Sequence, residues 1–560
     1  MPAITINVSR FSKLVGRTVT VAELVETLPW LGLDIEDVSE NEIKLEYNPN
    51  RPDYGCPIGI VRSYLGIKGL QEGLINYYVK ESDYEIYVNA SVKIVRPYIV
   101  GAVIKGVEID EDTLKEIINL QEDLHNGLGR KRRVAAIGLH NLDVIKFPLV
   151  YTTVDAKYKF LPLDSSREMS IEEILSEHPI GRMYSHLVKS LNRFPVIMDS
   201  NGKVISFPPV INSAYTALTP YTTKNIFIDV TGHDLNVLSS ILNILVTALC
   251  DYGGEAYSVK VVDGAEQRTY PLLIYEKLTI EYEKIVDLLG LSLTPNEVIS
   301  SLRKCRLDAI YEEGKFVCTI PPYRIDIMHP CDLIEEVAIG YGYWRIEPEA
   351  PTIYGTGKTL ERNRVKNKLI DIMVGAGFQE VINSTLTNPE DQYDKMLIDR
   401  PNYIEVKAPK SMLYRSLRTW IIPCLLNNLS KSKDAEYPHK IFELGPVVEL
   451  TGNKIVERDH LAVAISHYDA NYSEIKSILD SLMNLLPVEE YYVKEIKHNS
   501  FIDGRVGGIY VSGNLIGIIG ELHPQVLANY QLLMPTTAFE LDVDALIDLF
   551  ERLKERERYK

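Results

Sequence analysis

Short stretches in which apolar and polar residues alternate recur along this chain, and they are interrupted by segments with apolar residues three and four positions apart. Alternation is typical of strands with one buried face, and the wider spacing is typical of amphipathic helices. Strands are predicted at 98–106 and 226–230, and helices at 111–128, 294–303 and 360–375. The irregular succession of the two element types predicts an α+β fold with several domains.

The first 80 residues predict a small module of strands and helices. The alternating segment 4–10 predicts a strand and 20–28 a helix. The run N-P-N-R-P-D that follows cannot be regular structure, because Pro49 and Pro52 fix the backbone there. Asp53 can cap the next helix, and Arg51 and Asp53 are candidate interface residues.

The segment 321–346 carries an unusual group of carboxylates. A short β-prone segment, 323–326, is expected to be followed by a helix that begins near Asp332. Asp332, Glu335 and Glu336 would share one face of that helix, and Asp326 at the strand exit could reach the same side. An all-oxygen set of this kind suits Mg²⁺. The alternative is a solvated acidic first turn favoured by the helix dipole.

Small polar residues gather at a second strand-to-helix junction, within 207–249. Asn212 and Ser213 follow two prolines, and Asp229, Thr231 and His233 come near the end of the strand at 226–230. Such side chains can converge on a ligand beside helix N-terminal amides. The alternative is that they are helix caps and local hydrogen-bonding residues. No Ser-His-Asp order typical of a known hydrolase is present.

A basic cluster, Arg130–Arg133, follows Gly129 in an otherwise acidic chain. It could contact a phosphate backbone, or it could complement the C-terminal dipole of the preceding helix. The segment 355–359 resembles part of a phosphate-binding loop, but Thr352 stands where that motif needs Gly. We therefore expect a linker there.

Composition narrows the possible functions and the compartment. The 560 residues are enough for three to five domains. A formal net charge of −17 argues against a general nucleic-acid-binding surface, so RNA contacts must be local. Six scattered cysteines fit a reducing compartment. No signal core or long apolar run is present, so we expect a cytoplasmic protein without membrane contact.

The run R-I-D-I-x-H-x-x-D-L-I-E-E-V-x-x-x-Y-G-Y at 324–343 resembles the signature of the phenylalanyl-tRNA synthetase β subunit, archaeal and eukaryotic type. The N-P-N-R-P-D run, Leu417–Thr419 and Glu521–Pro524 match the same family in its order. The resemblance implies four domains. They are an N-terminal α/β module at 1–84, a β-rich editing domain at 85–268, a helix-turn-helix-like module with interface metal carboxylates at 269–350, and a class II synthetase-like antiparallel-sheet core at 351–560.

The resemblance also implies partners, cofactors and site residues. The chain would join an α subunit in an α2β2 heterotetramer that attaches phenylalanine to tRNA(Phe), with ATP used by the α subunit. Mg²⁺ would be held at the subunit contact by Asp326, Asp332, Glu335 and Glu336. The editing pocket, which hydrolyses tyrosine wrongly joined to the tRNA, would contain Asn212, Ser213, Asp229, Thr231 and His233.

The core at 351–560 is expected to be catalytically silent. A class II site needs a Gly-rich turn ending in Arg late in the chain, and this sequence shows Asp542 and Asp544 there. That difference disfavours an autonomous ATP-dependent ligase. DNA binding is disfavoured because the helix from Asp332 is acidic where a recognition helix presents basic or amide side chains. A purely structural subunit without editing activity stays open as the alternative.

Overall fold

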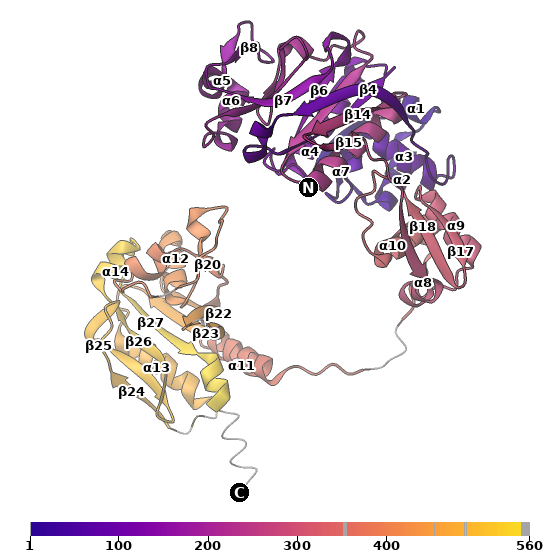
Figure 1. Ribbon diagram of the computed structural model, residues 1–560. Coiled ribbons are helices and arrows are strands. Elements are labelled where there is room, and N and C mark those ends of the chain that lie inside the picture. The colour runs from indigo at the N-terminus through magenta and orange to yellow at the C-terminus, as the bar shows by residue number, and fades with distance from the viewer. Residues whose placement is uncertain are drawn as a thin grey trace. The chain divides into compact units, whose positions relative to one another are not determined.

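The computed structural model describes residues 2–350, 355–401, 403–452, 454–486, 488 and 490–549. The chain divides between Ala350 and Pro351 into two compact units, each described here by itself (Figure 1). Both units combine helices with mostly antiparallel sheets, so the predicted α+β class is confirmed. Residues 355–360 have no regular structure, as expected of a linker.

The first unit begins with a small sheet and helices. The sheet order is β1 (Ala3–Asn7), β3 (Glu42–Tyr47) and β2 (Leu33–Val38), and the helices are α1 (Val8–Val15), α2 (Val21–Thr27) and α3 (Pro57–Ile67). The strand predicted at 4–10 is wrong beyond Asn7, because the Asn7 side chain accepts from Arg10 N and starts α1. The prediction that Asp53 caps α3 is also wrong. Cys56 holds that position, and Asp53 pairs with Arg51 at 2.9 Å.

A large, strongly mixed sheet follows. Its order is β12 (Ile211–Asn212), β11 (Val204–Phe207), β10 (Phe194–Met198), β7 (Leu149–Val154), β4 (Val79–Val88), β14 (Glu255–Asp263), β5 (Tyr98–Lys105), β13 (Ile226–Gly232) and β6 (Ala135–Asn141), with β15 (Glu266–Tyr270) paired to β14. β4 pairs in parallel with β14 and β7, and the remaining pairs are antiparallel. The predicted boundaries at 84 and 268 fall inside β4 and β15.

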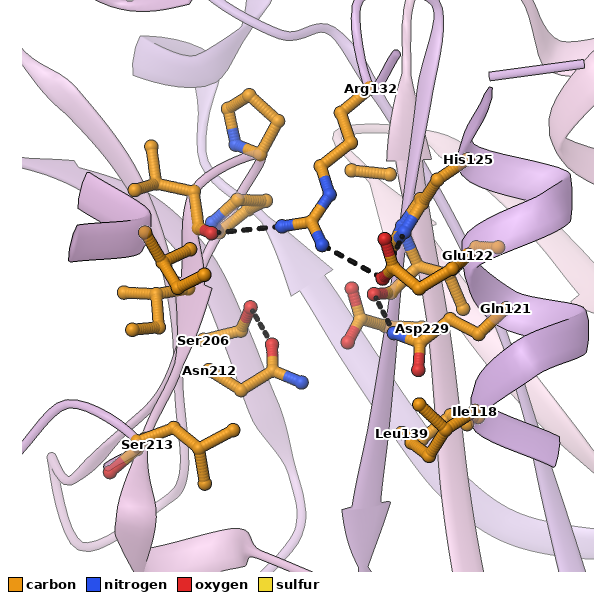
Figure 2. A pocket seen from close by; sticks show the side chains of 18 of the residues that line it. Ile118, Gln121, Glu122, His125, Arg132, Leu139, Ser206, Asn212, Ser213 and Asp229 are labelled. Carbon is orange, nitrogen blue, oxygen red and sulfur yellow. Dashed lines mark hydrogen bonds and ion pairs between the residues drawn. The ribbon is translucent and has the colours of Figure 1, made fainter. Parts of the chain in front are cut away.

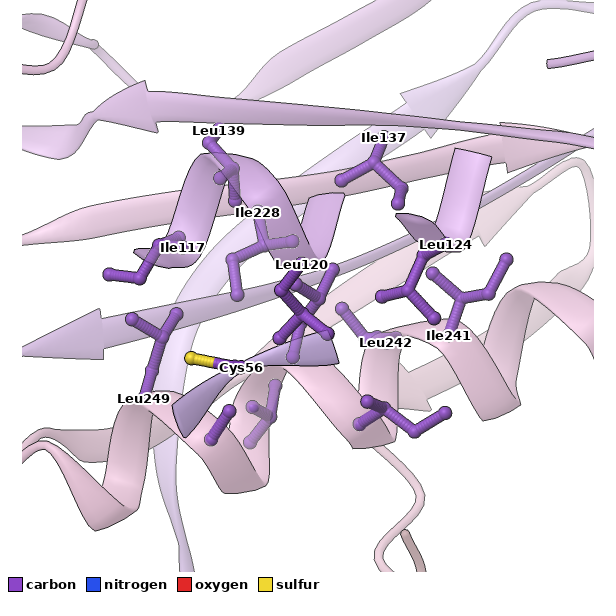
Figure 3. Close-up of a cluster of buried hydrophobic side chains, with 14 of the residues drawn as sticks. Cys56, Ile117, Leu120, Leu124, Ile137, Leu139, Ile228, Ile241, Leu242 and Leu249 are labelled. Atoms are coloured by element: carbon purple, nitrogen blue, oxygen red, sulfur yellow. The ribbon is translucent and has the colours of Figure 1, made fainter. Parts of the chain in front are cut away.

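Two amphipathic helices, α4 (Glu111–Asn126) and α7 (Leu235–Asp251), cover one face of β5, β13 and β6. Their apolar side chains, such as Leu120, Leu124 and Leu242, interdigitate with Ile228 of β13 (Figure 3). Cys56 of the N-terminal module lies in the same cluster. The N-terminal module and the large sheet therefore share one continuous hydrophobic core.

A lobe at 154–211 has its own small core and includes the outer strands β10 and β11 of the large sheet. It contains α5 (Ile171–Glu177), α6 (Pro179–Tyr184) and the short strands β8 (Lys159–Phe160) and β9 (Met169–Ser170). Phe194 and Phe207 meet edge to face inside it, with ring centroids 6.0 Å apart. The lobe forms the wall opposite α4 across the cavity described below.

The last part of the first unit is a three-stranded sheet with three helices. The elements are β16 (Glu276–Glu281), β18 (Lys315–Ile320), β17 (Asp308–Glu312), α8 (Tyr282–Leu289), α9 (Pro295–Lys304) and α10 (Pro330–Tyr341). The strand predicted at 323–326 is wrong. β18 ends before Pro321, whose carbonyl accepts from Arg324 N at 3.0 Å in a turn. The consecutive prolines have no N–H to donate to a ladder.

The second unit is built on a seven-stranded sheet. Its order is β19 (Gln379–Glu380), β22 (His439–Thr451), β23 (Lys454–Ser466), β27 (Thr536–Asp542), β26 (Asn514–Leu522), β25 (Phe501–Val511) and β24 (Tyr491–Glu495). Only β19 pairs in parallel. Two hydrophobic clusters cover opposite faces, one under α11 (Glu361–Gly375) and α13 (Tyr472–Asn484), the other under α12 (Ile422–Lys431) and α14 (Pro524–Asn529).

The segment 379–387 does not form one continuous strand. Only its ends pair, as β19 and as β20 (Leu386–Thr387), which joins β21 (Ser416–Leu417) in a separate ribbon. Between them Asn383 donates its backbone N–H and its side-chain amide to Glu443 instead of to a neighbouring strand. A side-chain carboxylate thus replaces the ladder at this point.

Candidate functional site

A cavity of about 580 Å³ opens between α4, β6 and β13 on one side and the lobe with the segment 206–218 on the other (Figure 2). Asn212, Ser213 and Asp229 line it. They come from β12, the turn after it and the middle of β13. Three of the five candidates are therefore brought together around one space.

Asp229 is held by a buried hydrogen-bonded chain. His140 Nε2 lies 2.7 Å from Asp229 Oδ2, and His140 Nδ1 lies 2.8 Å from Thr216 Oγ1. Asp229, His140 and Thr216 are each at most 1% exposed. A β-carbon at Gly138, the residue facing Asp229 on β6, would stand 2.0 Å from Asp229 Oδ2. The absence of a side chain at this position makes room for the carboxylate.

A second carboxylate, Glu122, lies on α4 at the edge of the cavity. Its Oε1 accepts from Arg132 Nη2 at 2.9 Å and from His125 Nδ1 at 3.0 Å (Figure 2). His125 Nε2 accepts from Ile137 N at 2.8 Å, so Nδ1 carries the proton. Burial on its own would raise the pKa of Glu122, but the bond from His125 and the charge of Arg132 lower it to about 2. Glu122 is therefore ionised at neutral pH.

Arg132 joins the two walls of the cavity. Besides Glu122, its Nη1 donates to the carbonyl of Val210 at 3.0 Å, and its guanidinium lies over the ring of Tyr184 at 4.2 Å. These contacts connect α4, the segment after β11 and α6. An arginine that makes them fixes the width of the opening.

Amides supply the remaining polar groups. Asn212 Oδ1 accepts from Ser206 Oγ at 2.9 Å, which turns its Nδ2 into the free donor (Figure 2). Gln121 Nε2 donates to Ile137 O at 2.9 Å, which leaves its Oε1 as the acceptor. Ser213 Oγ donates to the carbonyl of Leu161 at 3.0 Å rather than to a histidine. The serine is thus not arranged as a nucleophile.

Apolar side chains form most of the remaining wall. They are Leu114, Ile118, Ala136, Ile137, Leu139, Leu163, Ile180, Met183, Val210, Ile211, Ala217 and Leu218, together with Pro208 and Pro209. A space of this size with a few placed acceptors suits a small ligand that has an apolar body and a polar end.

The two other candidates lie outside this cavity. Thr231 is buried, and its Oγ1 accepts from Arg96 Nε at 2.9 Å. His233 lines a smaller neighbouring cavity of about 80 Å³. Thr231 follows Asp229 on β13, and His233 comes directly after that strand ends at Gly232.

Several lining residues were missed by sequence reasoning. Gln121 and His125 are the clearest case, because they share the core-facing side of α4 with Ile117 and Leu124. A polar residue at a core-facing position must find a partner, and that signal was in the sequence. His140 carried no comparable signal, since β6 is buried on both faces.

The four carboxylates of the other candidate site are divided between internal partners. Arg324 Nη2 lies 2.7 Å from Asp326 Oδ2 and 2.5 Å from Glu336 Oε1. Asp332 Oδ2 accepts from the backbone of His329 at 2.7 Å and so caps α10. Glu335 has no hydrogen-bond or ion-pair partner among the residues that the structure describes. Burial raises its pKa, and Glu336, Asp332 and Asp326 raise it further.

Within the part of the chain that the structure describes, no three His, Cys, Asp or Glu side chains meet closely enough to hold a metal ion. The oxygen chemistry of the four carboxylates suits a hard cation. In the isolated chain, however, Asp326 and Glu336 pair with Arg324, and Asp332 caps the start of α10. No helix in the described residues is long and apolar enough to cross a membrane.

Comparison with known proteins covers nearly the whole chain. The profile of the tRNA synthetase B5 domain matches residues 278–343, and that of the phenylalanyl tRNA synthetase beta chain CLM domain matches 346–543. The phenylalanine–tRNA ligase beta subunit of Archaeoglobus fulgidus is 41% identical over 99% of this chain and 100% of its own length. The chain belongs to the phenylalanine–tRNA ligase β subunit family.

Two further relatives agree with this membership. The β subunit of Methanocaldococcus jannaschii is 40% identical over 97% of this chain and all of its own length. A crystal structure of an N-terminal fragment of the Pyrococcus horikoshii β subunit covers 61% of this chain at 36% identity, with a TM-score of 0.59. The resemblance predicted from the signature at 324–343 is therefore confirmed, and the chain is an aminoacyl-tRNA synthetase component of protein biosynthesis.

Proposed function

We propose that the chain works with an α subunit that attaches phenylalanine to tRNA(Phe), and that residues 85–268 hydrolyse tyrosine wrongly joined to that tRNA. The observation that carries the second part is the cavity of about 580 Å³ with an apolar wall and two carboxylates, Glu122 and Asp229. The apolar wall suits the aromatic ring of tyrosine. The carboxylates can accept hydrogen bonds from its hydroxyl and its ammonium group.

The physical need for such a cavity is clear. A pocket shaped for phenylalanine cannot strongly reject an isostere with one added hydroxyl, and its discrimination is only about 10². A second pocket that accepts a hydrogen bond from that hydroxyl rejects phenylalanine instead, because its buried acceptor would be left unpaired. Asp229, at 1% exposed, is such an acceptor.

The side chains suggest hydrolysis by water rather than by a protein nucleophile. Ser213 donates to the carbonyl of Leu161 rather than to a base. Asp229 is already oriented by His140, and Glu122 stays ionised, so both can accept from an ammonium or a hydroxyl of the substrate. Asn212 Nδ2 is a donor toward the ester. A water positioned among these groups would attack the ester carbonyl, and the tRNA ribose would leave as the alcohol.

The second unit is proposed to be a catalytically silent core. A cavity of about 620 Å³ on its sheet is lined by Asp399, Glu449, Glu540 and Asp542, and no Lys or Arg lines it within the described residues. Glu540 accepts from the N–H groups of Ile421 and Ile422 at the start of α12. A triphosphate would meet carboxylates there.

Assembly with the α subunit, as α2β2, is proposed to use the carboxylates around α10. Of the four, Asp326 and Glu336 pair with the guanidinium of Arg324, while Asp332 accepts from the backbone N–H of His329. Burial raises the pKa of Glu335, and the negative charges of Glu336, Asp332 and Asp326 raise it further. Mg²⁺ bound there would neutralise this charge at the subunit contact, with Asp332 and Glu335 the carboxylates that Arg324 does not occupy.

The test is deacylation of tyrosyl-tRNA(Phe) by the assembled enzyme with wild-type chain and with Asp229→Ala. Loss of hydrolysis with phenylalanine charging unchanged is expected. Equal loss of both activities would indicate damage to the fold. If the wild-type complex releases no tyrosine, the chain is a structural subunit only.

A further inference from the structure

A second cavity, of about 80 Å³, adjoins the larger one and shares two of its wall residues, Arg132 and Pro209. Its other polar side chains are Arg96, Arg133 and His233. Apolar residues complete it, namely Val95, Leu187, Val188, Leu191 and Pro195. Three guanidinium groups around so small a space, with no carboxylate among its lining residues, make it a site for an anion.

Arg96 is the first independent sign of such a site. It is 3% exposed, and in the described residues it makes no ion pair. It donates from Nε and Nη2 to the hydroxyl and carbonyl oxygens of Thr231, at 2.9 and 2.5 Å. Burial lowers its pKa to about 10, although Tyr151 and Asp229 act in the opposite direction. A buried charge without a counterion is strongly unfavourable, so an anionic partner is expected.

The backbone of the basic cluster is the second sign. Arg130, Lys131 and Arg132 follow one another with φ of 47°, 54° and 65°. The left-handed region is unfavourable for residues other than glycine, and two backbone hydrogen bonds hold the turn in this conformation. Val134 N donates to Gly129 O at 2.9 Å, and Arg132 N donates to His125 O at 3.3 Å.

The basic side chains of this turn lie in different surroundings. Arg132 enters the shared wall and is the one residue of the cluster with a carboxylate partner in the described residues, Glu122. Arg133 lines the small cavity and is exposed. Arg130 and Lys131 are exposed and line neither cavity. Strain of this kind, at the edge of a binding space, is typical of a functional turn.

We infer that the small cavity binds the phosphodiester directly 5′ of the terminal nucleoside of the charged tRNA, with Arg96, Arg133 and His233 as donors and Arg132 between it and the esterified amino acid. This inference rests on the proposed hydrolysis and adds how the substrate is positioned. A phosphate accepts several N–H bonds at once, which fits a converging set of guanidinium groups. The two cavities share one wall, as the two ends of a single nucleotide would require.

The inference is tested with two minimal substrates and the assembled enzyme. One is adenosine esterified with tyrosine on its 2′ or 3′ hydroxyl, and the other is the same ester carrying a 5′-phosphate. Only the second can fill the small cavity. We expect the phosphate to raise kcat/KM by about tenfold or more, as charge-assisted hydrogen bonds do, with the change in KM rather than in kcat.

Arg133→Gln should remove this preference by raising KM for the phosphorylated ester, while the unphosphorylated ester is hydrolysed as before. Arg133→Lys should restore part of it. Arg130→Gln is the matched control, since Arg130 belongs to the same turn but lines neither cavity. It should leave the ratio of the two substrates unchanged.

Equal hydrolysis of both esters by the wild-type enzyme would overturn the inference while the proposed hydrolysis stands. A preference for the phosphate that survives Arg133→Gln would also overturn it, because the phosphate would then bind elsewhere. Inhibition of both esters by inorganic phosphate, without preference between them, would identify a free-anion site only. Hydrolysis of neither ester would remove the proposed function and this inference with it.

Discussion

His140 Nε2 lies 2.7 Å from Asp229 Oδ2, and neither side chain is more than 1% exposed. The two residues are on neighbouring strands, β6 and β13, whose register places Gly138 opposite Asp229. The pair thus lies over a glycine, and Asp229 of the pair lines the larger cavity. Its position depends on the register of the two strands rather than on any local motif.

Gly138→Ala should therefore disable the cavity without unfolding the sheet. A β-carbon there would stand 2.0 Å from Asp229 Oδ2 and 2.4 Å from His140 Nε2. The pair must move, and misplacement by about 1 Å can reduce a rate by about 10². We expect that loss in tyrosyl-tRNA(Phe) deacylation, with phenylalanine charging unchanged. Gly375→Ala, at a position with open space, is the control. A variant that deacylates normally would contradict the assigned role of the pair.

Arg324→Gln should loosen the module that contains α10. Arg324 is 5% exposed, and its guanidinium pairs with Asp326 and Glu336. Removing one partner of a buried ion pair leaves an unpaired charge and costs about 3–5 kcal/mol. Hydrogen exchange of the α10 amides in the assembled protein should show that the free energy of local opening falls by about 3–5 kcal/mol. The exposed Arg345→Gln should change the protection of α10 little, and equal effects of the two variants would count against this account.

Glu335→Gln and Glu336→Gln test the metal proposal, measured without and with Mg²⁺. Without divalent cations, Glu335→Gln should leave stability unchanged or raise it, because burial and then the charges of Glu336, Asp332 and Asp326 disfavour the ionised form of Glu335. With Mg²⁺ present, both variants should bind less metal and associate more weakly with the α subunit. Metal content by mass spectrometry and association by sedimentation are the measurements. Glu283→Gln, at an exposed position on α8, is the control. If neither Glu335→Gln nor Glu336→Gln changes metal content or association with the α subunit, the proposed metal site is wrong.

The second unit should lose stability as the pH rises above neutrality. Burial alone would lower the pKa of His460, but its hydrogen bond with Glu540 and the charge of that carboxylate raise it. The protonated form therefore stabilises the fold fully below the unfolded pKa of about 6.5, and this stability is lost as the pH passes the higher folded pKa. Thermal unfolding between about pH 6 and 9 should show the decline, and His460→Asn should flatten it.

His498 provides the contrast for that experiment. Burial lowers its pKa, so its contribution is present above the unfolded value and is lost as the pH falls through the folded one. His498→Asn should therefore change the acidic side of the profile and leave the alkaline decline in place. A wild-type profile that is flat above neutrality would contradict the role of the His460–Glu540 pair.

Much of the fold could be predicted from local signals. The helix at 294–303 was indicated by its periodicity, and the structure adds a capping box in which Thr294 and Glu297 bond reciprocally. The strand at 226–230 and the helix at 111–128 are likewise confirmed. The strand at 323–326 failed because its composition favours extended backbone, while the preceding prolines remove the donors that a ladder needs.

The site was only partly predictable for a different reason. Asp229, Asn212 and Ser213 stood out as polar residues at a junction, and all three line the cavity. His140 could not be found in this way, since its contact with Asp229 depends on which strands pair and in what register. Such non-local pairing is not visible in a single sequence. Glu122 was missed because a carboxylate on a helix is usually solvated.

The parallel pairing of β4 with β14 decides when the first unit can be completed during synthesis. Val79 on β4 is aligned with Ala256 on β14. β4 therefore cannot form this pairing until β14, which is synthesised much later, is available. Until then the edge of β4 and the apolar side of the N-terminal module stay exposed. Non-local strand pairing is also slow to form. We therefore expect chains that stop before residue 255 to aggregate or to need a chaperone, and the unit to acquire protease resistance only after β14 has left the ribosome.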